Sequence, residues 1–188
     1  MNSCKVAGAA VLALLLTACE PAYIIDEAQH YSRQLGIVND YNISRWHSYV
    51  YARESSFVLA ALVADKNIQQ PLLQVSEQAF AVYFARAVSV NTNTFTAALQ
   101  QARSQQASFL AVFMLSSLQQ FQNLDGSYEA GYKQADVLIT LYDVNSAKVV
   151  DKVSLKASKS LLSFAGENIT TLLHRPMLAV AAELSGGQ

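Results

Sequence analysis

The chain has 188 residues, of which 52% are hydrophobic and 14% charged, and this length suits a single domain. Lys5 is the only charged residue in positions 1–18, so removing it from the 13 basic residues leaves 12 against 14 acidic ones. The rest of the chain therefore has a net charge of −2 and no run of like charges, which argues against a nucleic-acid-binding protein.

The N-terminus has the layout of a secretory signal. Lys5 precedes an apolar run from Val6 to Leu16, and the small residues Thr17 and Ala18 precede a cysteine. About eleven apolar residues are too few to span a bilayer, which needs roughly 20. We therefore predict a cleaved signal peptide over residues 1–18. The alternatives are a buried core helix or a short membrane anchor.

The segment Leu16-Thr17-Ala18-Cys19 resembles a bacterial lipobox. This resemblance implies that Cys19 receives a diacylglycerol on its sulfur and, after cleavage, an acyl chain such as palmitate on its amine. Two or three acyl chains anchor a protein stably to a membrane. Because an aspartate after the cysteine favours inner-membrane retention in Gram-negative lipoproteins, Glu20 implies the outer membrane, with the domain in the periplasm.

The two cysteines are then both accounted for, since Cys4 leaves with the signal and Cys19 carries lipid. The mature chain therefore offers no disulfide and no cysteine metal ligand. Residues 19–45 mix tyrosines with polar residues and are predicted to form a lipidated tether, with residues 46–188 as the folded domain. The tether either extends from the domain or packs on it through its tyrosines.

The first half of the domain alternates short apolar runs with amphipathic stretches. Continuous apolar runs of strand length are typical of strands buried on both faces. Stretches with apolar residues at a period near 3.6 predict helices, the first beginning at a proline. In chain order we expect a strand at Phe57–Val63, a helix at Pro71–Ala87, a strand at Val88–Val90, a helix at Phe95–Gln105 and a strand at Phe109–Leu115.

A polar, turn-rich stretch follows at residues 119–134 and is predicted to be a long hairpin connection. It contains Phe121, Tyr128 and Tyr132 among glycines and amides. Aromatic side chains on such a loop suit contact with a partner protein, which makes these three residues a candidate partner-binding loop. The alternative is that the rings fold back over the core.

Two alternating stretches and a helix complete the domain. Asp136–Asp143 alternates between two apolar sets, and Val149–Ser158 alternates apolar residues with lysines and serines, as in a strand that is wet on one face. Because proline disrupts a helix interior, the last helix is expected to start at Pro176 and to end near Leu184. The prediction is a single α/β domain with a mixed sheet of about five strands, in the order βαβαβββα, and with helices packed on it.

From Trp46 to Leu184 the chain resembles a family of small bacterial lipoproteins defined by a domain of unknown function. The strand and helix order is also similar to the small α/β domains of the curli-secretion lipoprotein and of the Tol-system propeller protein. These resemblances imply an assembly or docking module and supply no catalytic residue; residues 119–134 depart from the family pattern. The resemblance rests on Trp46–Val63, Ala97–Arg103, Phe109–Leu115, Ala135–Val144, Val149–Leu155 and Phe164-Ala165-Gly166 before Pro176.

The sequence contains few motifs that are typical of catalytic sites. No glycine-rich phosphate loop follows a predicted strand, and the Gly-x-Ser-x-Gly elbow does not occur. His30 stands near two carboxylates but lacks the three or four ligands that a metal needs, so neither a metal nor another cofactor is expected. His47, beside Trp46, and His174 mark the alternative place for a small-ligand or hydrolase site.

The sequence thus predicts an outer-membrane-anchored lipoprotein that is not an enzyme and that acts as a binding or assembly module of the envelope. Its expected contacts are the membrane, through the lipid, and an envelope protein that the sequence does not identify. The alternative function is a periplasmic small-ligand-binding protein or hydrolase with a site near His47 or His174. A third hypothesis is that the domain inserts into a homo-oligomeric ring.

Overall fold

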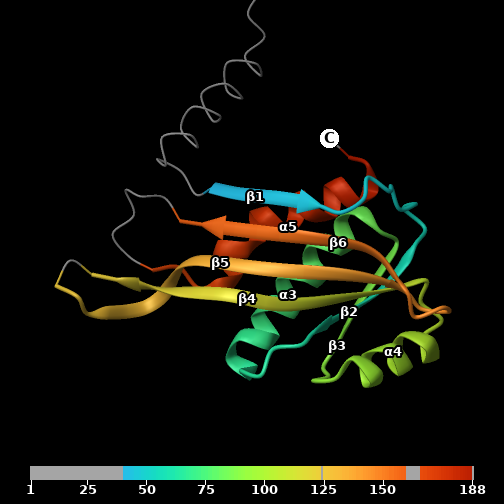
Figure 1. The fold of residues 1–188 in the computed structure, drawn as a ribbon, viewed down its shortest axis with the longest axis horizontal. Helices are drawn as coiled ribbons and strands as arrows, with labels where there is room; N and C mark the ends of the chain where they lie inside the picture. The colour runs from blue at the N-terminus through green and yellow to red at the C-terminus, as the bar shows by residue number, and fades with distance from the viewer. Residues whose placement is uncertain (1–39, 124, 160–165, 188) are drawn as a thin grey trace, which may run out of the picture.

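The computed structural model describes residues 40–123, 125–159 and 166–187. The predicted signal peptide, Cys19 and Glu20 lie outside these residues. The described part consists of a six-stranded sheet with three helices packed on it (Figure 1). In chain order the elements are β1 (Asp40–Arg45), β2 (Ser56–Ala61), α3 (Lys66–Tyr83), β3 (Arg86–Val90), α4 (Phe95–Ser104), β4 (Phe109–Gln122), β5 (Tyr128–Asp143), β6 (Val149–Ser158) and α5 (Ile169–Ser185).

The strands lie in the order β1-β6-β5-β4-β2-β3, which confirms the predicted single α/β domain with a mixed sheet. Strand β2 pairs in parallel with β3 and with β4, as expected for two βαβ crossovers, and β4, β5 and β6 form an antiparallel meander. The continuous apolar run of β2 fits its place between two parallel neighbours, because both of its faces are buried.

The sheet has six strands rather than about five, because the last six residues of the predicted tether form β1. This strand pairs antiparallel with β6, from Asp40 opposite Ser158 to Arg45 opposite Val153. Its burial alternates, and Tyr41 and Ile43 pack against the core. The remaining positions of β1 are polar or charged, so the segment has only two apolar residues to indicate a strand.

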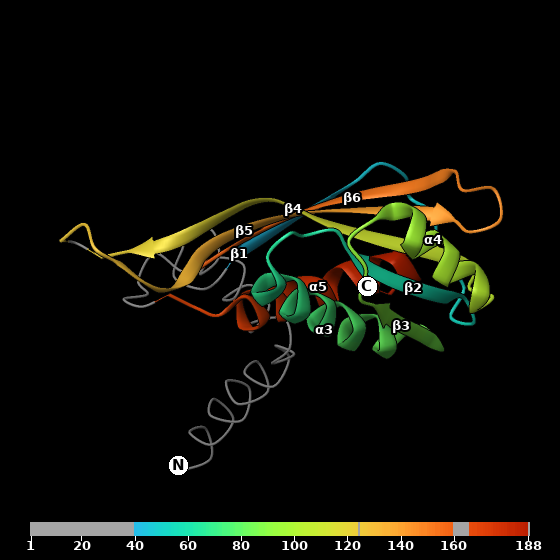
Figure 2. The same ribbon diagram turned by 90° about the horizontal axis from the view of Figure 1, so that it is seen from below.

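Helices cover the two faces of the sheet unequally (Figure 2). Helices α3 and α5 pack side by side on one face, where they form the larger core with β2, β4, β5 and β6. Helix α4 packs on the other face, mainly against β2 and β4 over Val58, Ala60, Leu110 and Val112, and its Phe95 ring contacts Tyr142 of β5. The outer faces of β6 and β1 therefore have no helix over them among the described residues, which agrees with the lysines and serines of β6.

The predicted helix starts at both prolines are wrong. Helix α5 begins at Ile169, where the side chain of Asn168 accepts from the Thr171 amide at 2.8 Å, and Pro176 lies inside it. Helix α3 begins at Lys66 after an Asp65 cap and contains Pro71. An interior proline costs about 3 kcal/mol, whereas each leucine or methionine buried by these helices returns about 1.5–3 kcal/mol. The buried apolar face of α5 therefore offsets the broken helix hydrogen bond.

Strands β4 and β5 are longer than their neighbours. Strand β2 pairs with β4 only as far as Phe113, and β6 pairs with β5 only from Gln134 onward. Beyond these points β4 and β5 pair with each other and form a two-stranded ribbon, which we call the arm (residues 120–133) and which extends past the rest of the sheet (Figures 1 and 2). The predicted hairpin connection at residues 119–134 is therefore mostly strand, with its turn between Gln122 and Tyr128.

Candidate functional site

The arm carries the three aromatic residues of the predicted partner-binding loop, and the structure places each differently. Tyr128 lies beside the turn with 66% of its surface exposed. Tyr132 is half-buried and packs against the core at the base of the arm. Phe121 is half-buried, and its Cβ lies 3.1 Å from the position that a Cβ on Gly166 would take. Of the three, Tyr128 is therefore the side chain that faces solvent.

The base of the arm is fixed by a close crossing of two glycines. Gly131 has a φ of +138°, and a Cβ built on it would lie 2.6 Å from the carbonyl carbon of Gly166. Beside this crossing Tyr132 and Glu167 exchange two backbone hydrogen bonds, of 2.8 and 3.1 Å. Only glycine permits this approach of two backbones and this φ. The arm is therefore attached to the segment before α5 at a defined point.

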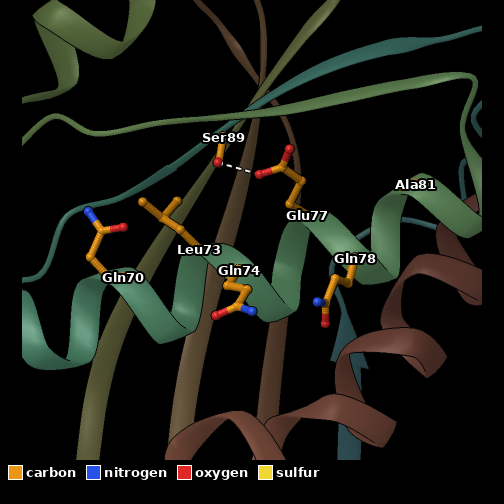
Figure 3. A pocket seen from close by; sticks show the side chains of 7 residues that line it. All are labelled: Gln70, Leu73, Gln74, Glu77, Gln78, Ala81 and Ser89. Atoms are coloured by element: carbon orange, nitrogen blue, oxygen red, sulfur yellow. Dashed lines mark hydrogen bonds between the residues drawn. The ribbon is translucent and has the colours of Figure 1, made fainter.

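A shallow groove of about 520 Å³ runs along the exposed side of α3 next to the edge strand β3 (Figure 3). Its lining is rich in amides, and its one carboxylate, Glu77, accepts a hydrogen bond from the Ser89 hydroxyl. The groove is lined by Gln70, Leu73, Gln74, Glu77, Gln78, Ala81 and Ser89.

A second hollow, of about 460 Å³, lies at the end of the sheet opposite the arm, beside the β1–β2 connection. Aromatic rings form most of its wall. Tyr51 is 7% exposed and packs edge-on against Phe109 and Phe57, with centroids 4.9 and 5.8 Å apart. We call this the aromatic hollow; it is lined by His47, Tyr49, Tyr51, Phe109, Val149 and Val150.

A buried ion pair supports the aromatic hollow. Asp151 is fully buried, and its Oδ2 lies 2.5 Å from a guanidinium nitrogen of Arg45. The same carboxylate accepts from the backbone amides of His47 and Lys152, at 3.2 and 2.8 Å. Arg45 also donates to the carbonyls of Tyr49 and Glu183, at 2.8 and 2.9 Å. This network fixes the loop that carries the wall of the hollow.

Two buried polar atoms in this network have no hydrogen-bond partner, the hydroxyl of Tyr51 and Nε of Arg45. Burial and the neighbouring negative charge of Asp151 together raise the pKa of Tyr51 to about 12, against a smaller opposing effect of Arg45. The phenol is therefore protonated at neutral pH and can donate a hydrogen bond.

The two histidines of the alternative site are not brought together. His47 lines the aromatic hollow, whereas His174 is exposed on α5. Nine residues of helix, about 14 Å, separate His174 from Glu183, whose carbonyl contacts Arg45 beside the hollow. The sequence singled out His47 but not Tyr51 or Asp151. Asp151 resembles any other polar residue in an alternating strand until its pairing with Arg45 is known.

Within residues 40–123, 125–159 and 166–187, no three histidine, cysteine, aspartate or glutamate side chains gather as a metal site would require. In the same residues no helix is both long and apolar enough to cross a membrane.

No protein-family model and no curated protein sequence matches the chain. Its fold is similar to that of PelC from Paraburkholderia phytofirmans, solved as a dodecamer, with a TM-score of 0.60 and 15% identity over 79% of this chain and 100% of PelC. A single-residue variant of the same PelC, also solved as a dodecamer, gives a TM-score of 0.59 and 14% identity, over 78% of this chain and 99% of that one.

A third structure, protein XCC0632 from Xanthomonas campestris, is 12% identical over 72% of this chain and 85% of its own, with a TM-score of 0.43. That protein is assigned to the family model DUF330. The similarity to PelC confirms the small α/β fold, and at these identities it shows the fold alone.

Proposed function

We propose that this protein is a lipid-anchored, non-catalytic module of the bacterial outer membrane that works by binding other protein chains through its arm. The observation that carries the proposal is the arm itself, a two-stranded ribbon that extends beyond its neighbouring strands and has an exposed aromatic residue beside its turn. The anchor follows from the lipobox at Cys19, and the outer-membrane address from Glu20.

Exposed backbone groups make the arm suitable for binding. The outer edge of β4 beyond Phe113 has no strand beside it among the described residues. The edge of β5 before Gln134 is contacted there only by the backbones of Glu167, at Tyr132, and of Lys159, at Lys133. Such edges accept an added strand from another chain, which supplies main-chain hydrogen bonds. Two register shifts between β4 and β5, at Gln119/Gln120 and at Gln120/Gln122, interrupt the ladder in the arm and limit unspecific edge-to-edge pairing.

The attachment at Gly131 and Gly166 also supports the proposal that the arm binds another chain. A ribbon that is fixed at its base loses less conformational freedom on binding than a flexible loop does. The arm also lies at the end of the sheet where β1 begins, so the chain that leads to Cys19 enters the domain at the same end (Figure 1). An arm partner would therefore be found on the side of the domain where the tether enters.

A second copy of this chain is the first partner to test, because PelC, whose fold is similar, was solved as a dodecamer. The free edges of the sheet belong to two different strands, β1 and β3. A contact between unlike surfaces of identical chains generates a ring when the rotation closes. The arm would then join neighbouring subunits.

The test is crosslinking in cells from a photoreactive residue at position 128. A matched control carries the same residue at position 82, because Val82 is 56% exposed on α3 and lies outside the arm. We expect a discrete adduct from position 128 that is absent from position 82 and is lost in Cys19→Ser. An adduct with the mass of two chains identifies self-assembly, and another mass identifies a different envelope protein. Absence of any adduct specific to position 128 would contradict the proposal.

The alternative of a hydrolase at His47 or His174 has less support. The carboxylate that contacts His47 in the network is that of Asp151, which accepts from the His47 backbone amide and is paired with Arg45. A catalytic acid or base must instead reach the reacting atoms with its side chain. The small-ligand alternative retains one supporting feature, the aromatic hollow.

A further inference from the structure

We infer that the connection between β1 and β2 rests on the surface of a phospholipid bilayer, with the side chains of Trp46, Tyr49 and Val50 in the headgroup region. We call residues 46–50 the contact loop. It lies at the end of the sheet opposite the arm (Figure 1). The inference rests on the lipid anchor of the proposed function, and it is independent of what the arm binds.

The first observation is a concentration of exposed hydrophobic side chains at this end. Trp46, Tyr49 and Val50 are 63%, 62% and 65% exposed, and Val149, which is 38% exposed, lines the aromatic hollow together with Tyr49. These four are more than half of the seven large hydrophobic side chains that are exposed in the described part of the chain. Such a gathering marks a surface that is covered by a partner or by a membrane.

The kinds of side chain indicate a membrane. Tryptophan and tyrosine have an apolar body and a polar tip, and they are enriched where hydrocarbon meets water. Lys152 adds a positive charge beside them, since its Nζ lies 4.7 Å from the centroid of the Trp46 ring. A lysine at this place can extend its amine to lipid phosphates while its stem covers apolar surface.

The rings of the contact loop leave no slot between them. The ring centroids of Trp46 and His47 are 5.2 Å apart, as are those of His47 and Tyr49. The three rings therefore form one continuous ridge. A ridge offers no cavity to a small ligand, whereas a bilayer surface can cover its outer side without one.

The charges around the contact loop are compatible with phospholipid headgroups. The loop contains no acidic residue, and Asp151 beneath it is fully buried and paired with Arg45. Glu183, whose carbonyl accepts from Arg45, is exposed, and Lys152 beside Trp46 carries the opposite charge. The contact therefore depends on burial of apolar surface more than on attraction to anionic lipid.

The backbone of the loop argues against an added protein strand at this place. Several main-chain groups are bonded inside the domain, namely the amides of Trp46, His47 and Tyr51 and the carbonyl of Tyr49. The loop therefore presents side chains, unlike the outer edge of β4 in the arm, where a strand could pair. Main-chain groups that are already bonded can also approach lipid without losing hydrogen bonds.

The chain before β1 is long enough for this contact. Positions 20 to 39, twenty residues, lie between Cys19 and Asp40, and twenty residues span at most about 70 Å. Strand β1 has six residues and separates Asp40 from Trp46 by about 20 Å. The tether can therefore bring both ends of β1 to the surface that holds the lipid. Two attachments fix the orientation of the domain, which a lipid alone does not.

The experiment measures the depth of Trp46, which is the only tryptophan in the chain. The full-length lipoprotein is reconstituted into vesicles of phosphatidylethanolamine and phosphatidylglycerol, with or without bromine on the acyl chains, and is isolated with them by flotation. We expect the brominated lipids to quench the emission of Trp46 and dissolved iodide to quench it only weakly.

The matched control moves the reporter to the opposite edge of the sheet. Gln74 is exposed in the groove beside β3, and β1 and β3 are the two edge strands. In Trp46→Phe combined with Gln74→Trp, brominated lipids should leave the emission unchanged and iodide should quench it strongly. Tyr49→Ser combined with Val50→Ser keeps Trp46 and should lose quenching by brominated lipids, because less apolar surface remains to be buried.

The outcomes separate this inference from the proposed function. In a protein that floats with the vesicles, absence of bromine quenching at position 46, or equal quenching at positions 46 and 74, overturns the inference alone. Emission at short wavelength without bromine quenching would assign the loop to a protein contact instead. A chain that does not float with the vesicles overturns the anchor, and the inference with it.

Discussion

At the arm end of the sheet, the backbones of Tyr132 and Glu167 bond directly, and two glycines touch without any side chain between them. At the opposite end, the chain is held by side chains, with the buried carboxylate of Asp151 linking Arg45 to two backbone amides. The first arrangement tolerates polar, solvent-facing strands because it needs little apolar burial. The second arrangement buries the Arg45–Asp151 pair away from water. Aromatic rings lie beside the pair and line the hollow at this end.

Removing the buried carboxylate of Asp151 should lower the free energy of unfolding more than any other change considered. In Asp151→Ala the guanidinium of Arg45 remains mostly buried without its counter-charge, and the amides of His47 and Lys152 lose their acceptor. We expect the free energy of unfolding to fall by about 3–5 kcal/mol. Urea denaturation measures this value. A loss below about 1 kcal/mol would show that the pair does not hold this end of the sheet.

High pH should weaken the same end selectively. The pKa of Tyr51 is raised to about 12, so the folded protein retains this proton above pH 10, where the unfolded chain has released it. The stability supplied by this group is complete below pH 10 and is lost as the pH rises towards 12, by up to about 3 kcal/mol. Urea denaturation between pH 9 and 11.5 should show a steeper decline in the wild type than in Tyr51→Phe. Equal slopes would contradict the assignment.

The arm end should lose stability when a glycine at its base is replaced by a residue with a Cβ. Gly131→Ala combines an unfavourable φ with a Cβ at 2.6 Å from Gly166, and we expect a loss of about 2–3 kcal/mol and faster hydrogen exchange at the Tyr132 and Glu167 amides. Gly126→Ala is the matched control. Its φ is +84°, but its Cβ would meet only the Gln122 amide at 3.9 Å, so about 1 kcal/mol is expected. Equal effects would mean that the glycine crossing does not fix the arm.

The smallest effect on stability should come from the side chain proposed to bind a partner. Tyr128 is 66% exposed, so Tyr128→Ala should change the free energy of unfolding by less than about 0.5 kcal/mol. The same variant should lose its partner in a pull-down from crosslinked cells. A large loss of stability would instead assign Tyr128 to the fold.

The comparison also explains what the sequence could predict. The predicted bounds of strand β6 match the observed ones because the alternation from Lys152 to Ser158 reflects one solvent-exposed face and one buried face. The continuous run of β2 was equally informative, since both of its faces are covered. In each case the neighbours of a strand determine its residue pattern over the whole length.

The features that were missed depend on contacts between distant residues. Strand β1 has few apolar residues and is stabilised by pairing with β6, more than 100 residues later. The sequence of the arm is typical of a loop because most of its side chains are polar and few of them pack against the core. A proline in a local pattern predicts a helix start, as at Pro71 and Pro176, because the pattern does not show how much apolar surface α3 and α5 bury. The aromatic hollow combines residues from 47 to 150, and only His47 was visible as a candidate.

The place of β1 at the edge of the sheet has a mechanical consequence. The chain enters the fold at Asp40, so a pull on the preceding residues loads first the pair between Asp40 and Ser158, at one end of the β1–β6 ladder. At the other end of that ladder, Arg45 is tied to Asp151, Tyr49 and Glu183. The ion pair therefore holds the last residue of β1 after the other pairs of the ladder have opened. When the domain is pulled by its tether, β1 should detach from β6 before α5 and the meander of β4, β5 and β6 are disturbed.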